Sequence, residues 1–181
     1  MIADPDPSDR APALFQLPAA SVQIDVSMQN PRWRALDLDA ESLCRQAVTD
    51  TLSAIGSDSA VLEISVVLGD DELLRRLNHE TRGVDRPTNV LAFPGDPLGD
   101  SLPDGAPCLL GDVVLSHETI DKEARQQDKL FENHLRHMIV HGVLHLLGYG
   151  HDTAVEAQTM EALEMTILAG MEIPDPYESG S

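Results

Sequence analysis

The sequence predicts an α+β protein: a single compact domain with one small mixed β-sheet covered by helices. Segments with apolar residues at helical spacing and segments with β-branched or alternating apolar residues both recur along the 181 residues. The two kinds do not follow a strict strand–helix–strand alternation, which favours this class over a doubly wound parallel sheet. Hydrophobic residues make up 42% of the chain, which is enough for one core, and this length suggests one domain.

The elements can be placed in order along the chain. Strands with β-branched or alternating runs are predicted at residues 22–28, 60–69, 88–94 and 109–116. Helices are predicted at residues 39–56, 70–82, 117–127, 130–148 and 154–170. The first two helices begin with acidic residues, and Gly56 ends the first. Acidic residues at the start and glycine at the end are common at helix boundaries. Gly148 is expected to end the fourth helix as a left-handed cap.

The remaining segments define the domain limits. Residues 1–20 are rich in Pro, Asp and Ala and are predicted to form a disordered acidic tail. The domain is predicted to span residues 21–177, followed by a flexible C-terminus at residues 178–181. Residues 95–108 contain several glycines and prolines, so they are predicted to form a loop.

The chain is strongly acidic, with 31 Asp and Glu against 12 Lys and Arg and a formal net charge of −19. This charge argues against a broad basic surface that wraps nucleic acid, because phosphate binding is largely electrostatic. Four arginines nevertheless lie close together in the sequence: Arg75, Arg76, Arg82 and Arg86. Such a patch can guide a phosphate chain, but alone it fits an ordinary helix face with ion pairs equally well.

The sequence gives no sign of export or of membrane insertion. Cys44 and Cys108 do not form a C-x-x-C pair, so no disulfide framework is indicated. The N-terminus is acidic and proline-rich, unlike a secretory signal. The most apolar stretch, MIVHGVLHLLG, is too short to span a bilayer. We therefore expect a cytoplasmic protein with no membrane partner.

The segment HGVLHLLGYGH has the histidine spacing of a catalytic zinc site. His141 and His145 are four residues apart and lie on one helix face. Gly148 breaks the helix, so that His151 can return to the same face. Three imidazoles with an open fourth position are typical of catalytic zinc, whereas structural zinc usually has four protein ligands. We therefore predict one zinc ion per chain at these three histidines.

The same spacing occurs in zinc proteases with the motif H-E-x-x-H-x-x-G-x-x-H, but the glutamate of that motif is Gly142 here. In those enzymes the glutamate activates the zinc-bound water. Gly142 has no side chain, and the neighbouring Val143 and Leu144 are inert, so peptide hydrolysis is disfavoured. A phosphodiester remains a suitable substrate, because its cleavage needs charge neutralisation more than proton abstraction.

The stretch HGVLHLLGYGHD resembles the H-G-x-L-H-L-x-G-Y-D-H signature of the YbeY family, the bacterial zinc-dependent endoribonucleases of ribosomal RNA maturation. A second block, LNHETRGVDRPTNVLAFP, is similar to that family's L-N-x-x-Y-R-G-x-D-x-P-T-(N/D)-V-L-S-F-P block. The segments LGDVVLS, MEALEMTIL and IPDPY also fit. The resemblance covers residues 22–177 and includes several blocks in the same order.

The resemblance implies a compact α+β fold, zinc bound by His141, His145 and His151, and Arg82 as a catalytic residue. It implies cleavage of single-stranded RNA in 3′-end maturation of small-subunit ribosomal RNA and in late-stage ribosome quality control. The implied partner is the ribosomal subunit or a ribosome-assembly protein.

Departures from the family pattern matter at two positions. The family's aspartate before the third histidine is Gly150, with an acid following at Asp152, and the tyrosine before the arginine is Thr81. Gly150 is expected to loosen the turn or to remove an acid that supports a zinc ligand. Four residues are candidates for supporting the ligands or contacting the substrate: Asp152, Arg86, Asn89 and His137.

Two other functions remain open at the level of the sequence. A zinc metallopeptidase would share the histidine spacing, and an assay with a protein substrate would distinguish it. A non-catalytic ribosome-assembly factor would keep zinc for stability. Such a factor would bind the ribosomal subunit and leave RNA uncut.

Overall fold

The computed structural model describes residues 22–56, 62–95 and 107–178. Its sheet has four strands in the order β1-β2-β4-β3. Strand β1 is parallel to β2 and β2 is parallel to β4, whereas β3 is antiparallel to β4. The strands are β1 (Val22–Met28), β2 (Leu62–Gly69), β3 (Val90–Pro94) and β4 (Cys108–Ser116). This mixed sheet confirms the predicted fold class.

The predicted helices are all present, with bounds within two residues of those expected. They are α1 (Ala40–Ile55), α2 (Asp71–Arg82), α3 (His117–Gln126), α4 (Phe131–Leu146) and α5 (Ala154–Gly170). A short 3₁₀ helix, η2 (Pro31–Ala35), was not predicted. It buries Trp33, whose indole N–H donates to the Gly69 carbonyl at 2.8 Å. A five-residue turn is too short to show helical periodicity in a sequence.

The predicted tail at residues 1–20 lies outside the described residues. The same holds for most of the predicted loop at 95–108 and for the end of the predicted C-terminus at 178–181. The domain limits therefore stay predictions. Among the described helices, none has the length and apolar character that crossing a membrane requires.

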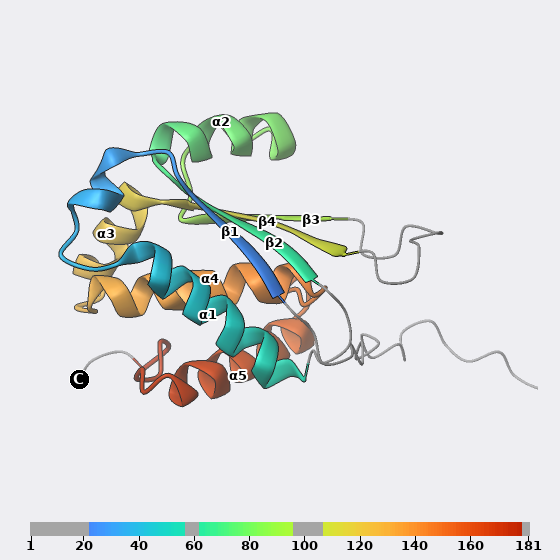
Figure 1. The fold of residues 1–181 in the computed structure, drawn as a ribbon. Coiled ribbons are helices and arrows are strands. Elements are labelled where there is room, and N and C mark those ends of the chain that lie inside the picture. Colours follow the sequence, from blue (N-terminus) through green and yellow to red (C-terminus); the bar gives the residue numbers. More distant parts are fainter. Residues whose placement is uncertain (1–21, 57–61, 96–106, 179–181) are drawn as a thin grey trace, which may run out of the picture.

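The helices form layers on both faces of the sheet (Figure 1). Helix α2 covers one face, α1, α3 and α4 lie on the other side, and α5 lies beyond α4 and α1. The main core joins the sheet to α1 and α4, and a second cluster that includes Val140, Leu144 and Leu168 joins α4 to α5. Helix α4 is thus packed on two sides, so its side chains have fixed surroundings.

Gly142 lets α4 lie directly against the sheet. A Cβ at this position would lie 2.7 Å from Val113 Cγ1 and 3.3 Å from Val90 Cγ2. Carbon atoms do not approach that closely without one of them moving, and interior packing leaves little room for movement. The position that carries glutamate in zinc proteases is therefore a helix–sheet contact here.

Candidate metal centre

The structure brings the three predicted zinc ligands together. His141 and His145 lie on α4, and His151 lies in the turn that follows. One nitrogen from each of the three rings lies within 4.8 Å of the other two. Among the described residues, no other group of three or more His, Cys, Asp or Glu has this geometry. The three histidines could therefore hold a metal ion.

The predicted glycine turn after α4 is confirmed, and it is what returns His151 to the cluster. Gly148 has a φ of 89°, in the left-handed region that glycine adopts without strain. Its N–H donates to the His145 carbonyl at 3.0 Å, and the N–H of Tyr149 donates to the Leu144 carbonyl at 3.0 Å. These bonds satisfy the last carbonyls of the helix while the chain reverses.

Hydrogen bonds fix which nitrogen of two ligands faces the cluster. His141 Nδ1 lies 2.7 Å from Glu164 Oε1, and His145 Nδ1 lies 3.0 Å from the Tyr149 carbonyl oxygen. Both oxygens can only accept, so in the neutral rings each Nδ1 carries the proton and each Nε2 carries a lone pair. These two Nε2 atoms are 3.0 Å apart. Two lone pairs at that distance repel unless a cation lies between them.

The spacing also suits zinc. Two nitrogens of a tetrahedral zinc site with Zn–N bonds of about 2.0–2.1 Å lie roughly 3.3 Å apart. Burial and the neighbouring His141 and His151 lower the pKa of His145 to about 4. His145 is therefore neutral at physiological pH, as a metal ligand must be.

Glu164, which sequence reasoning missed, connects the metal ligands to the interior. This residue of α5 is 0% exposed. Its Oε1 accepts from His141, while its Oε2 accepts from His137 Nε2 at 2.9 Å and from the Tyr177 hydroxyl. Burial would raise the pKa of Glu164, but the hydrogen bonds from His137, His141 and Tyr177 lower it to about 2. The carboxylate is therefore ionised and holds His141 in its metal-binding tautomer.

The sequence contains a signal that could have identified Glu164. The buried residues of α5 are Met160, Glu164, Ile167 and Leu168. They lie at spacings of four, seven and eight residues from the first, which is one helix face. An acid in the middle of an apolar face must have a buried partner.

Of the other candidates, His137 is buried and contacts Glu164, which in turn contacts His141. Asp152 lines the same cleft as the three histidines but is exposed, and no hydrogen bond joins it to a histidine among the described residues. Asn89 lines the cleft as well, with Nδ2 donating to Glu123 Oε2 at 3.0 Å. Arg86 is exposed and is not among the residues that line the cleft.

The cleft has a volume of about 480 Å³. Two groups of residues line the cleft: the three histidines, from α4 and the turn after it, and Arg82, Asn89 and residues of β3. We call the first group the α4 wall and the second group the β3 wall. Arg82 is the last residue of α2, where Gly83 ends the helix with a φ of 70°. Among the four arginines of the predicted basic patch, Arg82 alone lines the cleft, and Arg75 forms an exposed ion pair with Asp85 at 2.6 Å. Of the predicted basic patch, one arginine therefore lies at the cleft.

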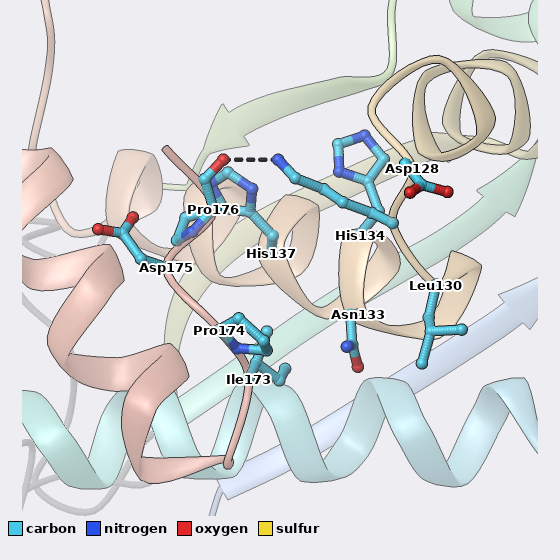
Figure 2. A pocket seen from close by; sticks show the side chains of 10 residues that line it. Asp128, Leu130, Asn133, His134, His137, Ile173, Pro174, Asp175 and Pro176 are labelled. Carbon is cyan, nitrogen blue, oxygen red and sulfur yellow. Dashed lines mark hydrogen bonds between the residues drawn. The ribbon is translucent and has the colours of Figure 1, made fainter. Parts of the chain in front are cut away.

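A second cavity of about 230 Å³ lies between α4 and the C-terminal segment (Figure 2). It is lined by His134, His137, Lys129 and residues 173–176, among others. The Nδ1 atoms of His134 and His137 are buried and have no hydrogen-bond partner among the described residues. His134 Nε2 lies 2.8 Å from Glu123 Oε2, so each of the two histidines is held by one carboxylate.

The chain is similar to known proteins over most of its length. The model of the family described as "Endoribonuclease YbeY" matches residues 27–172. The endoribonuclease YbeY of Nitrobacter winogradskyi is 45% identical over 146 residues, which cover 80% of this chain and 76% of that protein. That of Paramagnetospirillum magneticum is 45% identical over 158 residues, which cover 87% and 96% of the two chains.

One solved structure has the same fold. The solution structure of TM1509 from Thermotoga maritima matches with a TM-score of 0.51 and 20% identity, covering 87% of this chain and 99% of that one. At this identity the likeness concerns the fold alone. The family match spans most of the chain, including all three clustered histidines and Arg82, and the chain therefore belongs to the YbeY endoribonuclease family.

Proposed function

We propose that this chain is a zinc-dependent endoribonuclease that cleaves single-stranded RNA. The observation that carries the proposal is the cleft, which is lined by both the three-histidine cluster and Arg82. Family membership supports a role in 3′-end maturation of small-subunit ribosomal RNA and in late-stage ribosome quality control. It also supports a cytoplasmic location and a ribosomal subunit or ribosome-assembly protein as partner.

The chemistry is divided between the two walls. Zinc held by His141, His145 and His151 would supply a Lewis acid that neutralises charge on a phosphodiester oxygen. The Arg82 guanidinium has a planar fork of N–H donors that can bind two phosphate oxygens at once. Its place at a helix end, facing the cleft, suits this role. Glu164 holds His141 so that Nε2 faces the cluster.

The packing at Gly142 argues against a zinc peptidase. The general base of such enzymes would be a glutamate at position 142, where even a Cβ would lie 2.7 Å from Val113 Cγ1. Of the acids near the histidines, Glu164 is buried and engaged by three donors, and Asp152 is exposed. A nuclease therefore fits this cleft better than a peptidase.

The proposal is tested with purified wild-type protein and His145→Ala prepared by one protocol. We expect about one zinc per chain in the wild type, and cleavage of single-stranded RNA containing the small-subunit 3′ end. His145→Ala should lose most of the zinc and of the cleavage, because two imidazoles hold zinc poorly. Metal analysis and gel electrophoresis of the RNA measure the two effects.

Three results would contradict the proposal. Full zinc content in His145→Ala would show that the metal is bound elsewhere. Equal RNA cleavage by both proteins would assign the activity to a contaminant. A wild type that holds zinc and binds the ribosomal subunit without cutting RNA would favour a non-catalytic assembly factor.

A further inference from the structure

Residues 176 and 177, at the end of the C-terminal segment 173–177, are each linked to the rest of the molecule by a hydrogen bond that involves a side chain. We call these two bonds the tethers of the segment. The Tyr177 hydroxyl donates to Glu164 Oε2. Lys129 Nζ donates to the Pro176 carbonyl oxygen at 2.5 Å, the contact drawn as a dashed line in Figure 2. Only the first of these bonds reaches a residue that touches a metal ligand. Removing each bond in turn can therefore distinguish an effect of docking the segment from a direct effect on the histidine cluster.

The three donors on Glu164 are divided between its two oxygens. Oε1 accepts from His141, whereas Oε2 accepts from both His137 and Tyr177. A carboxylate can rotate about its last bond, so donors on Oε2 fix the plane in which Oε1 faces His141. Among the described residues no Lys or Arg forms an ion pair with Glu164. Its orientation therefore depends on these three donors, of which Tyr177 alone lies outside α4.

We infer that Tyr177 is a positioning residue for the metal centre: its hydroxyl orients Glu164, and Glu164 orients His141 for metal binding. The inference rests on the proposed function, because it requires a metal ion at the three histidines. It assigns a role in the site to a residue that is 26 positions beyond the last clustered histidine, His151. The supporting partners of metal-bound histidines set both ring orientation and metal affinity.

Tyr177→Phe is a sharp test because it removes the hydroxyl and little else. Tyr177 is 45% exposed, and its ring meets that of His137 edge-on with centroids 5.7 Å apart, a contact that phenylalanine can keep. Lys129→Met is the matched control, since it removes the other tether of the same segment without touching Glu164. Both variants are made in the full chain and compared with the wild type.

The zinc affinity is measured by competition with a chelator, and the visible absorption spectrum of the cobalt(II)-loaded protein reports the ligand geometry. Tyr177→Phe should weaken zinc binding by about 3–10-fold, less than the 10–100-fold typical of losing a whole supporting group, because Glu164 keeps two donors. It should also change the cobalt spectrum. Lys129→Met should leave both properties as in the wild type.

Each other outcome overturns the inference in a different way. Equal weakening in both variants would mean that segment docking, not the hydroxyl, supports the site. Wild-type affinity and spectrum in Tyr177→Phe would mean that His137 alone orients Glu164. A wild type that binds neither zinc nor cobalt would refute the proposed function itself, and the inference with it.

Discussion

The two walls of the cleft are built in different ways. On the α4 wall, His141 and His145 each have an acceptor at Nδ1, and the acceptor of His141 is fully buried. On the β3 wall, Arg82 is exposed, and among the described residues no hydrogen bond or ion pair holds its guanidinium. One wall is therefore arranged before any ligand arrives, whereas the other gains its order from what it binds.

This difference separates two kinds of contribution to activity. A preorganised histidine wall sets metal affinity, and removing its supports should change metal binding first. An arginine without side-chain partners in the free protein contributes little to the fold and acts when charge develops on a substrate. Changes in the two walls should therefore give different patterns of zinc content, stability and cleavage rate.

The largest effect is expected for Arg82→Ala. Loss of one positioned donor to a charged transition state costs about 10²–10³-fold in rate. The variant should therefore cleave single-stranded RNA more slowly by that factor, with the zinc content and melting temperature of the wild type. Arg82→Lys should recover only part of the rate, because an ammonium lacks the planar fork.

Arg86→Ala is the matched control for this prediction, since Arg86 is exposed nearby but does not line the cleft. It should cleave RNA at nearly the wild-type rate. If Arg82→Ala loses zinc or unfolds at a lower temperature, the proposed independence of the two walls is wrong. If it cleaves as fast as the wild type, Arg82 is a surface residue.

The next effect is expected for Glu164→Gln, measured as zinc affinity by chelator competition. Glutamine has one accepting oxygen where Glu164 serves three donors, so its NH₂ group must face at least one of them. An NH₂ facing His141 Nδ1 would move the ring proton to Nε2, where it blocks the metal. We expect zinc binding to weaken by about 10–100-fold, the range typical for such supporting groups.

Glu161→Gln controls for the loss of one charge on the same helix, because Glu161 is exposed. It should bind zinc as the wild type does. Wild-type affinity in Glu164→Gln would show that the buried carboxylate does not set the tautomer of His141. The α4 wall would then owe its order to packing alone.

Much of the fold followed from periodicity, and the three-histidine cluster followed from spacing. The helix carrying His141 and His145 and the turn at Gly148 are local features, so a short stretch of sequence determines them. Glu164 was missed because its partners come from α4 and from the C-terminal segment, and no local pattern pairs them. The sequence showed that Gly142 replaces the protease glutamate, but only the structure shows why a glycine is needed there: the helix packs against Val113 at this position.

Asp152 was a candidate because it is close in sequence to His151, and its support for a ligand stays a prediction. Asp152 is exposed at the cleft, with no hydrogen bond to a histidine among the described residues. Gly150, where the family pattern has aspartate, has open space around the position of a Cβ, so a side chain fits there. Asp152→Ala therefore removes an acid from this turn, and Gly150→Asp adds one, without repacking of the surroundings.

The smallest effect is expected for Asp152→Ala, again measured as zinc affinity. An exposed charge near a cation is screened by water and salt and is worth at most about 1 kcal/mol, or about fivefold in affinity. Asp152→Ala should therefore weaken zinc binding by less than about fivefold, well below the effect of Glu164→Gln. Gly150→Asp should tighten binding by a similarly small factor, because His151 has no hydrogen-bond partner among the described residues. A loss of tenfold or more in Asp152→Ala would mean that this carboxylate supports His151 once the metal is bound. The support of the α4 wall would then extend beyond the buried Glu164 to an exposed acid beside the third ligand.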